Sequence, residues 1–308
     1  MRAADNKERS KLLGSEPLKI RKAEEDDLGR LKAIWKLCFG DEDNYIDFYF
    51  NHRDWRKEMA VLLLDGGVVS MLTMIPADIV GRDGRKIKSS MLYAIATHPQ
   101  YRKRGLADRL MEWSSRQLLS NQIPVTMLVP AEPELFNFYD GRGYKTNFFI
   151  REAILTRELI ENLADSNHAE CCLYPAEPDG YNRIRRKLLT GFPYVDYREA
   201  EILFQKKASQ LFGADIYAVT AGGEEGCAIV ERTEEKVIVK ELLIPDKYLG
   251  PVVKEISKRV PAQRYIVRTP SFTWDKTGGA VRPFGMLRAS NGSPGPMPED
   301  IYLGIAYD

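Results

Sequence analysis

The chain of 308 residues contains 44% hydrophobic and 29% charged residues and has a net charge of +1. This is the composition of a soluble globular protein long enough for two domains, and it argues against long disordered segments. A net charge near zero gives no bulk attraction to nucleic acid or to an anionic membrane, so we expect neither as a partner.

The cysteines and histidines give no sign of a metal site or a disulfide framework. The four cysteines form no Cys-x-x-Cys pair, and the three histidines lack metal-ligand spacing. We therefore expect no metal, and a cytoplasmic location is the simplest interpretation. Residues 1–17 are polar and lack the apolar core of a signal peptide, so we interpret them as a flexible N-terminal segment. No apolar run approaches bilayer-spanning length.

The first half of the chain begins with a predicted edge strand at 18–21. Acidic residues at 24–27 suit the first turn of a helix that runs to Cys38, and a second short helix is predicted over 44–50. The aromatic residues of this second helix are interpreted first as core residues.

Two hairpin turns follow, at 65–67 and at 81–84, because both contain the glycine and aspartate typical of such turns. They predict strands on each side, over residues 59–64, 68–75, 79–80 and 87–89.

A short basic loop connects the next strand to a helix. Residues 90–97 are mostly apolar and are followed by Pro99, which predicts a buried strand. Ala107, Met111 and Leu118 recur at helical spacing. The loop between them contains three consecutive basic residues and a glycine. Since the first N–H groups of a helix have no internal partner, such a turn is suited to bind phosphate.

A second segment pairs a strand at 125–129 with a short helix. Proline residues at 130 and 133 end the strand, and Tyr139 lies on the apolar face of the helix. Gly141 and Gly143 end that helix, and a strand at 148–156 follows. This order of elements predicts an α/β fold with a mixed sheet.

Two motifs in these segments resemble those of the GCN5-related N-acetyltransferases. Arg102-x-x-Gly105-x-Ala107 is similar to the signature [Gln/Arg]-x-x-Gly-x-[Gly/Ala], and 139–144 is similar to Tyr-x-x-x-Gly-[Phe/Tyr]. The resemblance covers about residues 18–156. It implies an α/β (α+β) fold with a mixed, mostly antiparallel central sheet flanked by helices. It also implies direct transfer of an acetyl group from acetyl-coenzyme A to a primary amine on a small molecule or peptide.

The resemblance also implies which residues bind the cosubstrate. The loop and the helix start would grip its pyrophosphate, and the main chain of the preceding strand would pair with its pantetheine arm. The implied binding residues are Ile95, Ala96, Thr97, Arg102, Lys103, Arg104, Gly105, Leu106 and Ala107. Tyr139 would face the sulfur atom, and a phenol is protonated at neutral pH, so we assign it the proton for the departing thiolate.

The base and the acceptor pocket stay open. His98, Glu132, Asp140 and the carboxylate of Asp308 are candidate bases, and relayed water is another. We expect the acceptor wall over 35–50 and 72–80, with a contribution from the second half of the chain as an option.

The second half begins after a connecting region at 157–180 and covers 181–308. Its predicted helices and strands cover 181–189, 196–212, 216–220, 227–232, 237–244, 248–259, 265–268 and 301–306, with an exposed loop at 291–298. Three strands, a helix and a strand repeat the order of the first half, but the basic loop is missing. We interpret 181–308 as a degenerate second copy, similar to tandem acetyltransferases of the enhanced-intracellular-survival type. An unrelated α+β module is the alternative.

Two other functions remain open at this point. The first is a sensor or scaffold that binds acyl-coenzyme A without turnover, and the second is transfer of a longer acyl or an aminoacyl group. A homo-oligomer is also compatible with the sequence.

Overall fold

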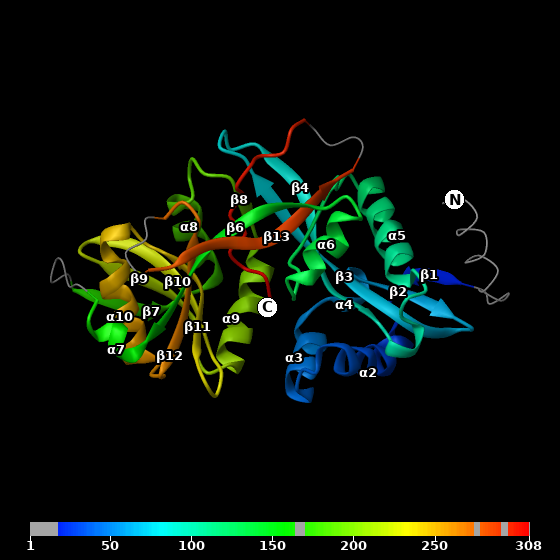
Figure 1. Ribbon diagram of the computed structural model, residues 1–308, viewed down its shortest axis with the longest axis horizontal. Helices are drawn as coiled ribbons and strands as arrows, with labels where there is room; N and C mark the ends of the chain where they lie inside the picture. The colour runs from blue at the N-terminus through cyan, green and yellow to red at the C-terminus, as the bar shows by residue number, and fades with distance from the viewer. Residues whose placement is uncertain (1–17, 164–169, 274–277, 291–294, 308) are drawn as a thin grey trace. The chain divides into compact units, whose positions relative to one another are not determined.

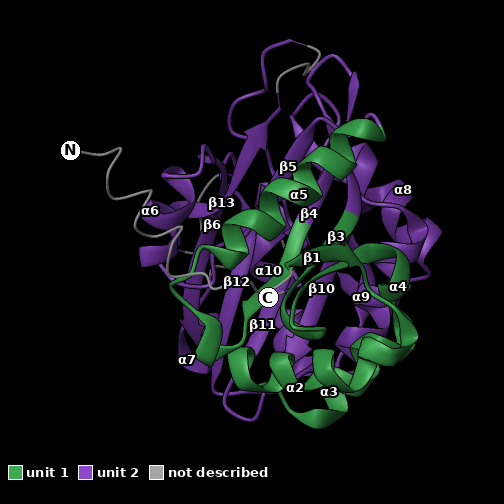
Figure 2. Ribbon diagram, turned by 90° about the vertical axis from the view of Figure 1, so that its right-hand side faces the viewer, with its two compact units in different colours: residues 1–75, 92–121 green, residues 76–91, 122–308 purple. Residues whose placement is uncertain are grey.

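The computed structural model describes residues 18–163, 170–273, 278–290 and 295–307 (Figure 1). It is a mixed α/β fold with a large, mostly antiparallel sheet and flanking helices, which confirms the predicted fold class. The chain divides into two compact units, residues 1–75 with 92–121 and residues 76–91 with 122–308 (Figure 2). The domain boundaries at 156 and 180 stay predictions.

The first unit is built on β-strands that neighbour one another in the order β1, β2, β3 and β4 (Lys86–Thr97), the last contributing residues 92–97. β1 (Lys19–Lys22) pairs with β2 (Met59–Leu64), and β2 pairs with the first part of β3 (Gly67–Val80). All six residues of β2 are buried, which explains its uninterrupted apolar sequence. The helical elements of this unit are η1 (Glu25–Asp27), α2 (Leu28–Phe39), α3 (Asp43–His52), α4 (Trp55–Glu58), η2 (Pro99–Tyr101) and α5 (Leu106–Ser120).

The core of the first unit is aromatic where α2 meets α3. The Trp35 ring lies 4.5 Å from that of Tyr49 and 5.8 Å from that of Phe50, between ring centroids. All three side chains are buried, so the predicted core role is correct for Tyr49, whereas Tyr45 and Phe48, which were predicted with it, are half-buried.

Two predicted strand breaks are wrong. The strands expected at 68–75 and 79–80 are one strand, β3, and those expected at 87–89 and 90–97 are one strand, β4 (Lys86–Thr97). Residues 68–75 are all buried, and the strand continues through half-buried Pro76, because the fixed φ of proline is compatible with an extended chain. The turn at 81–84 is confirmed, with the Gly81 N–H donating to the Arg85 carbonyl at 2.9 Å.

The second unit contains the longer run of paired strands, in the order β4-β5-β13-β6-β12-β11-β10-β9-β7, and β8 pairs with the end of β3. The strands are β5 (Val125–Leu128), β6 (Lys145–Thr156), β7 (Cys171–Pro175), β8 (Tyr194–Asp196), β9 (Ile216–Ala221), β10 (Glu224–Arg232), β11 (Val237–Leu243), β12 (Arg264–Pro270) and β13 (Ala280–Ala289). Its helical elements are α6 (Glu134–Asp140), α7 (Arg157–Glu161), α8 (Pro178–Leu188), α9 (Glu199–Leu211), η3 (Asp246–Tyr248) and α10 (Leu249–Arg259).

Four strand assignments in this unit differ from the sequence prediction, and one of them is β8, which was not predicted. β13 was not predicted, and it pairs antiparallel with both β5 and β6. β7 lies in the region interpreted as a connection and pairs with β9. The strand expected at 301–306 is wrong, because only isolated bridges at Ile301 and Tyr302 form there.

The chain order β2, β3, β4, α5, β5 recurs as β9, β10, β11, α10, β12. In each run the strands flanking the helix are parallel and pair over only three residues. Each run also has an irregularity five residues before a proline. Ala94 has a φ of +49° and precedes Pro99, whereas Lys240 is the extra residue of a β-bulge and precedes Pro245. The two halves therefore share local details as well as element order.

Candidate functional site

The loop between β4 and α5 has an unusual backbone. Lys103 and Gly105 have φ values of +64° and +70°, on either side of Arg104. Left-handed residues in such a turn direct successive N–H groups to one side, which makes an anion-binding concavity. A Cβ on Gly105 would meet open space, so the glycine is required for its backbone conformation and not for lack of room.

The N-terminus of α5 is open. Its N-cap is Gly105, which supplies no capping side chain, and the Arg109 N–H donates to the Gly105 carbonyl at 3.2 Å. The N–H groups of residues 106–108 precede that bond and therefore lack an acceptor within the helix. Leu106 is buried and fixes the helix start, while Arg102, Lys103 and Arg104 are exposed. This end of α5 can bind an anion through peptide N–H groups and basic side chains.

Arg102 is directed back to the end of β4. Its Nε donates to the Thr97 carbonyl at 3.1 Å, and its Nη2 lies 3.4 Å from Cys38 Sγ. Cys38 Sγ also donates to the Thr97 carbonyl, at 3.4 Å. An amide group that pairs with Thr97 would compete with Arg102 for this oxygen. The guanidinium of Arg104 lies over the Tyr101 ring, 5.4 Å from its centroid.

The end of β4 is strained and held in place. Ala94 occupies the left-handed region, which is costly for a residue with a Cβ, and strain of this kind concentrates at functional sites. Ser70 Oγ donates to the Ala96 carbonyl at 2.7 Å, and the His98 N–H donates to the Val69 carbonyl at 2.9 Å. These bonds fix the main chain of Ile95–Thr97, the segment predicted to pair with pantetheine.

Tyr139 lies in α6 and belongs to the second unit. Its side chain is buried, and burial raises its pKa to about 12, with Tyr144 adding to the rise and Arg142 opposing it. The two tyrosine rings are edge to face, with centroids 5.9 Å apart. Tyr139 is therefore a neutral phenol at physiological pH and can donate a proton.

The spacing of the second motif has a structural explanation. Gly143 has a φ of +81°, which reverses the chain after α6. The Tyr144 N–H can then donate to the Tyr139 carbonyl at 3.2 Å. The Tyr144 hydroxyl lies 2.9 Å from Thr126 Oγ1, which connects α6 to β5.

The candidate bases differ in their surroundings. Burial, with help from Arg30 and Arg102, lowers the pKa of His98, so its ring is neutral at pH 7. Glu132 is exposed, and Asp140 is exposed and paired with Lys145 at 2.7 Å. Asp308 lies outside the described residues.

The predicted acceptor wall is partly core. Trp35 is buried and its Nε1 donates to Asp41 at 2.7 Å, whereas Tyr45 is half-buried. The Tyr45 hydroxyl lies 3.3 Å from that of Tyr93, a pair that the sequence did not predict. Burial raises the pKa of Tyr93 well above its usual value, so the Tyr93 hydroxyl stays protonated.

Within the described ranges, no group of three or more His, Cys, Asp or Glu side chains is placed to hold a metal ion. No helix in that part of the chain is both long enough and apolar enough to cross a membrane. The cosubstrate and catalytic roles of the predicted site residues stay predictions, with the loop and the end of β4 in the first unit and Tyr139 in the second.

Residues 19–146, which contain both motifs, match a family described as acetyltransferase (GNAT) domain. This match confirms the resemblance read from the two motifs. No curated protein sequence matches the chain significantly.

Solved structures of low sequence identity share the fold. A GCN5-related N-acetyltransferase from Kribbella flavida has a TM-score of 0.67 at 13% identity, over 89% of this chain and 71% of that chain. One from Anabaena variabilis gives 0.68 at 17%, over 89% and 73%. Eis1 from Mycobacterium abscessus gives 0.64 at 13%, over 89% and 74%. The similarity therefore extends well beyond residue 146.

Proposed function

We propose that the protein is a cytoplasmic N-acetyltransferase that moves an acetyl group from acetyl-coenzyme A to a primary amine on a small molecule or peptide. The open N-terminus of α5, with its left-handed loop and three basic residues, is the observation that carries this proposal. It provides N–H donors and positive charge for a diphosphate. The GNAT match over 19–146 supports the same class of reaction.

Each part of the site has a proposed role in transfer. The main chain of Ile95, Ala96 and Thr97 orients the acyl arm, while residues 102–107 hold the diphosphate. An amine with a pKa near 10.4 is mostly protonated at pH 7, so one proton leaves to water or to neutral His98 before attack. A C–N bond forms, the C–S bond breaks, and Tyr139 protonates the departing thiolate; the proton that the acylated nitrogen then loses returns through water to the Tyr139 phenolate.

We propose that the second half is a degenerate copy without its own cosubstrate. The repeated element order and the matched irregularities at Ala94 and Lys240 support this proposal. In the second copy α10 follows η3 directly, without the basic left-handed loop. The fold shared with Eis1 over 89% of the chain is consistent with a tandem arrangement.

A calorimetric titration with coenzyme A tests the anchor. The variant Arg102→Glu/Gly105→Val removes a cation and the left-handed glycine, so we expect at least a tenfold loss of affinity. Arg116→Glu is the matched control, because Arg116 is an exposed residue of the same helix, far from its N-terminus. Undiminished binding by the folded double variant would refute the anchor.

A thiol-release assay over a broad panel of amines tests the reaction itself. We expect release of free thiol with acetyl-coenzyme A and at least one primary amine, and slower release with longer acyl donors. Binding of acetyl-coenzyme A without release for any amine would favour the sensor function instead. Faster release with a longer acyl donor would reassign the donor.

A further inference from the structure

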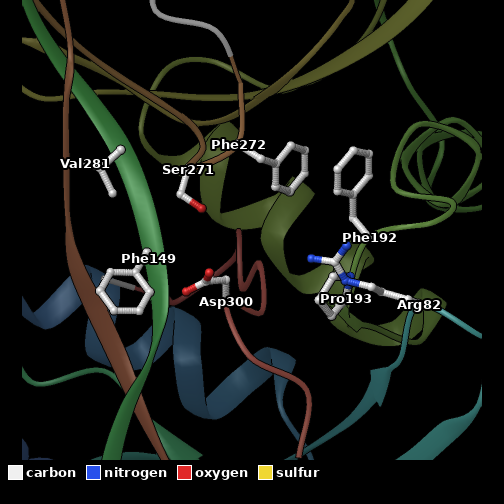
Figure 3. A pocket seen from close by; sticks show the side chains of 8 residues that line it. All are labelled: Arg82, Phe149, Phe192, Pro193, Ser271, Phe272, Val281 and Asp300. Carbon is white, nitrogen blue, oxygen red and sulfur yellow. The ribbon is translucent and has the colours of Figure 1, made fainter.

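The second unit contains a cavity outside the segments assigned to acyl transfer. Its volume is about 420 Å³, within the range of small-molecule sites (Figure 3). It is lined by residues of the β3–β4 turn, of β6 and β13, of the segment before β8, and of the segments that follow β12 and precede Ile301.

One side of the cavity is aromatic and exposed. The rings of Phe192 and Phe272 stack with centroids 3.9 Å apart and an interplanar angle of 5°. Their exposed fractions are 37% and 41%, and that of nearby Val281 is 47%. Large apolar side chains that remain this accessible in one cavity indicate a surface that binds an apolar or planar group.

The same cavity contains opposite charges that do not neutralise each other. Arg82 and Asp300 are both exposed, and neither has an ion pair or side-chain hydrogen bond within the described part of the chain. In the view of Figure 3 the Arg82 guanidinium lies below the stacked Phe192–Phe272 pair, beside Pro193, and the Asp300 carboxylate lies between Arg82 and Phe149. A ligand that carries both a negative and a positive group can therefore pair with both side chains.

The cavity walls are held before any ligand binds. Arg151 donates to the carbonyls of Thr273 and Gly279, at 3.0 and 2.8 Å, which fixes the segment that presents Phe272. Asp300 has a φ of +51°, uncommon for a residue with a side chain, and the next N–H, of Ile301, donates to the Asn147 carbonyl at 3.1 Å. Such preorganisation lowers the entropy lost on binding.

We propose that this cavity binds a free aromatic amino acid as its zwitterion. The carboxylate pairs with the Arg82 guanidinium, whose fork matches two carboxylate oxygens. The ammonium group pairs with the Asp300 carboxylate, and the side-chain ring packs against the Phe192–Phe272 pair. A nucleotide fits less well, because Asp300 would repel its phosphates. This assignment does not depend on acetyl transfer.

Equilibrium dialysis of the full chain without coenzyme A tests the ligand class. L-Phenylalanine is compared with 3-phenylpropanoate, which lacks the ammonium group, and with phenethylamine, which lacks the carboxylate. We expect saturable binding of one phenylalanine per chain and at least tenfold weaker binding of the two analogues. No saturable uptake of phenylalanine, or equal affinity for all three compounds, would overturn the proposal.

Two charge variants test the residue assignments. Asp300→Asn suits the left-handed backbone and removes the anion. It should weaken phenylalanine binding at least tenfold and leave phenylpropanoate binding unchanged. Arg82→Gln should weaken phenylalanine binding and leave phenethylamine binding unchanged. Glu299→Gln, at the exposed neighbouring position, is the control and should change neither. Equal losses for all ligands in a folded variant would contradict the assigned charge contacts.

Discussion

Replacing Arg185 by methionine should destabilise the second unit severely. The Arg185 and Glu241 side chains are fully buried, and the Arg185 Nε lies 3.1 and 3.0 Å from the two carboxylate oxygens. Arg185 also donates to the carbonyls of Val195 and Leu303, at 2.7 and 3.3 Å. Removing one partner of a buried ion pair leaves an uncompensated charge, which costs about 3–5 kcal/mol. That is a large share of a typical ~5–15 kcal/mol free energy of unfolding.

Urea unfolding followed by circular dichroism can separate the charge effect from the lost packing. Glu241→Gln alone should also destabilise, because it leaves the arginine charge buried without an anion. In the Arg185→Met background the same substitution should stabilise, by about 2 kcal/mol, since it removes the unpaired carboxylate. Arg183→Gln is the control, because Arg183 lies on the same helix as Arg185. This substitution removes an exposed ion pair with Glu225 of β10 and should leave the midpoint nearly unchanged. Simply additive effects of the two buried substitutions would refute the reasoning.

Four further predictions concern the site and the core. Tyr139→Phe should lower turnover about 100-fold or more in the thiol-release assay with unchanged coenzyme affinity, and equal turnover would exclude its role as acid. Ser70→Ala removes a buried donor to the end of β4 and should lower the free energy of unfolding by about 1 kcal/mol in a urea titration; an unchanged midpoint would contradict this. Burial alone would raise the pKa of Glu152, but hydrogen bonds led by Arg282 lower it. The ionised Glu152 carboxylate therefore stabilises the fold. This contribution is fully present above the ordinary carboxyl pKa and is lost as the pH falls through the lowered value. Arg282→Gln should therefore lower the thermal midpoint at pH 7 and lose this difference in strong acid, and a pH-independent difference would count against the linkage. Gly304→Ala should prevent normal folding, because φ is +72° and the new Cβ would overlap the Glu241 carboxylate; a wild-type melting curve would contradict this.

The parts of the fold that the sequence predicts are those encoded locally. β2 was predicted at 59–64, where the structure has it, because an apolar run ends at the Asp65-Gly66 turn. β13 was missed because Pro283 and Gly285 interrupt its pattern, and its pairing with β5 and β6 joins residues more than a hundred positions apart. No local signal encodes such a pairing.

The same distinction applies to the candidate site. The loop could be recognised because six consecutive residues carry its glycine and basic side chains, and the structure gives Gly105 the backbone that the motif requires. The irregularity at Ala94 has no glycine to indicate it. Arg185 was also missed, although a signal exists, since it follows Tyr181 by four residues and so lies on the buried face of α8. An arginine at such a position indicates a buried partner.

The structure gives a physical reason why a second cosubstrate site would be absent from the second half. When the two halves are aligned on Pro99 and Pro245, Glu241 corresponds to Ile95. Ile95 belongs to the strand end that is proposed to meet the acyl arm. Glu241 is buried and paired with Arg185, and the backbone at Gly304 lies directly against its carboxylate. The Leu303 carbonyl accepts from Arg185 at the same place. Under the proposed duplication, the segment at Leu303 and Gly304 therefore covers the strand end that corresponds to the proposed position of the acyl arm. A loop that binds diphosphate would have no function beside a strand end that is already covered, which supports the proposal of a degenerate copy.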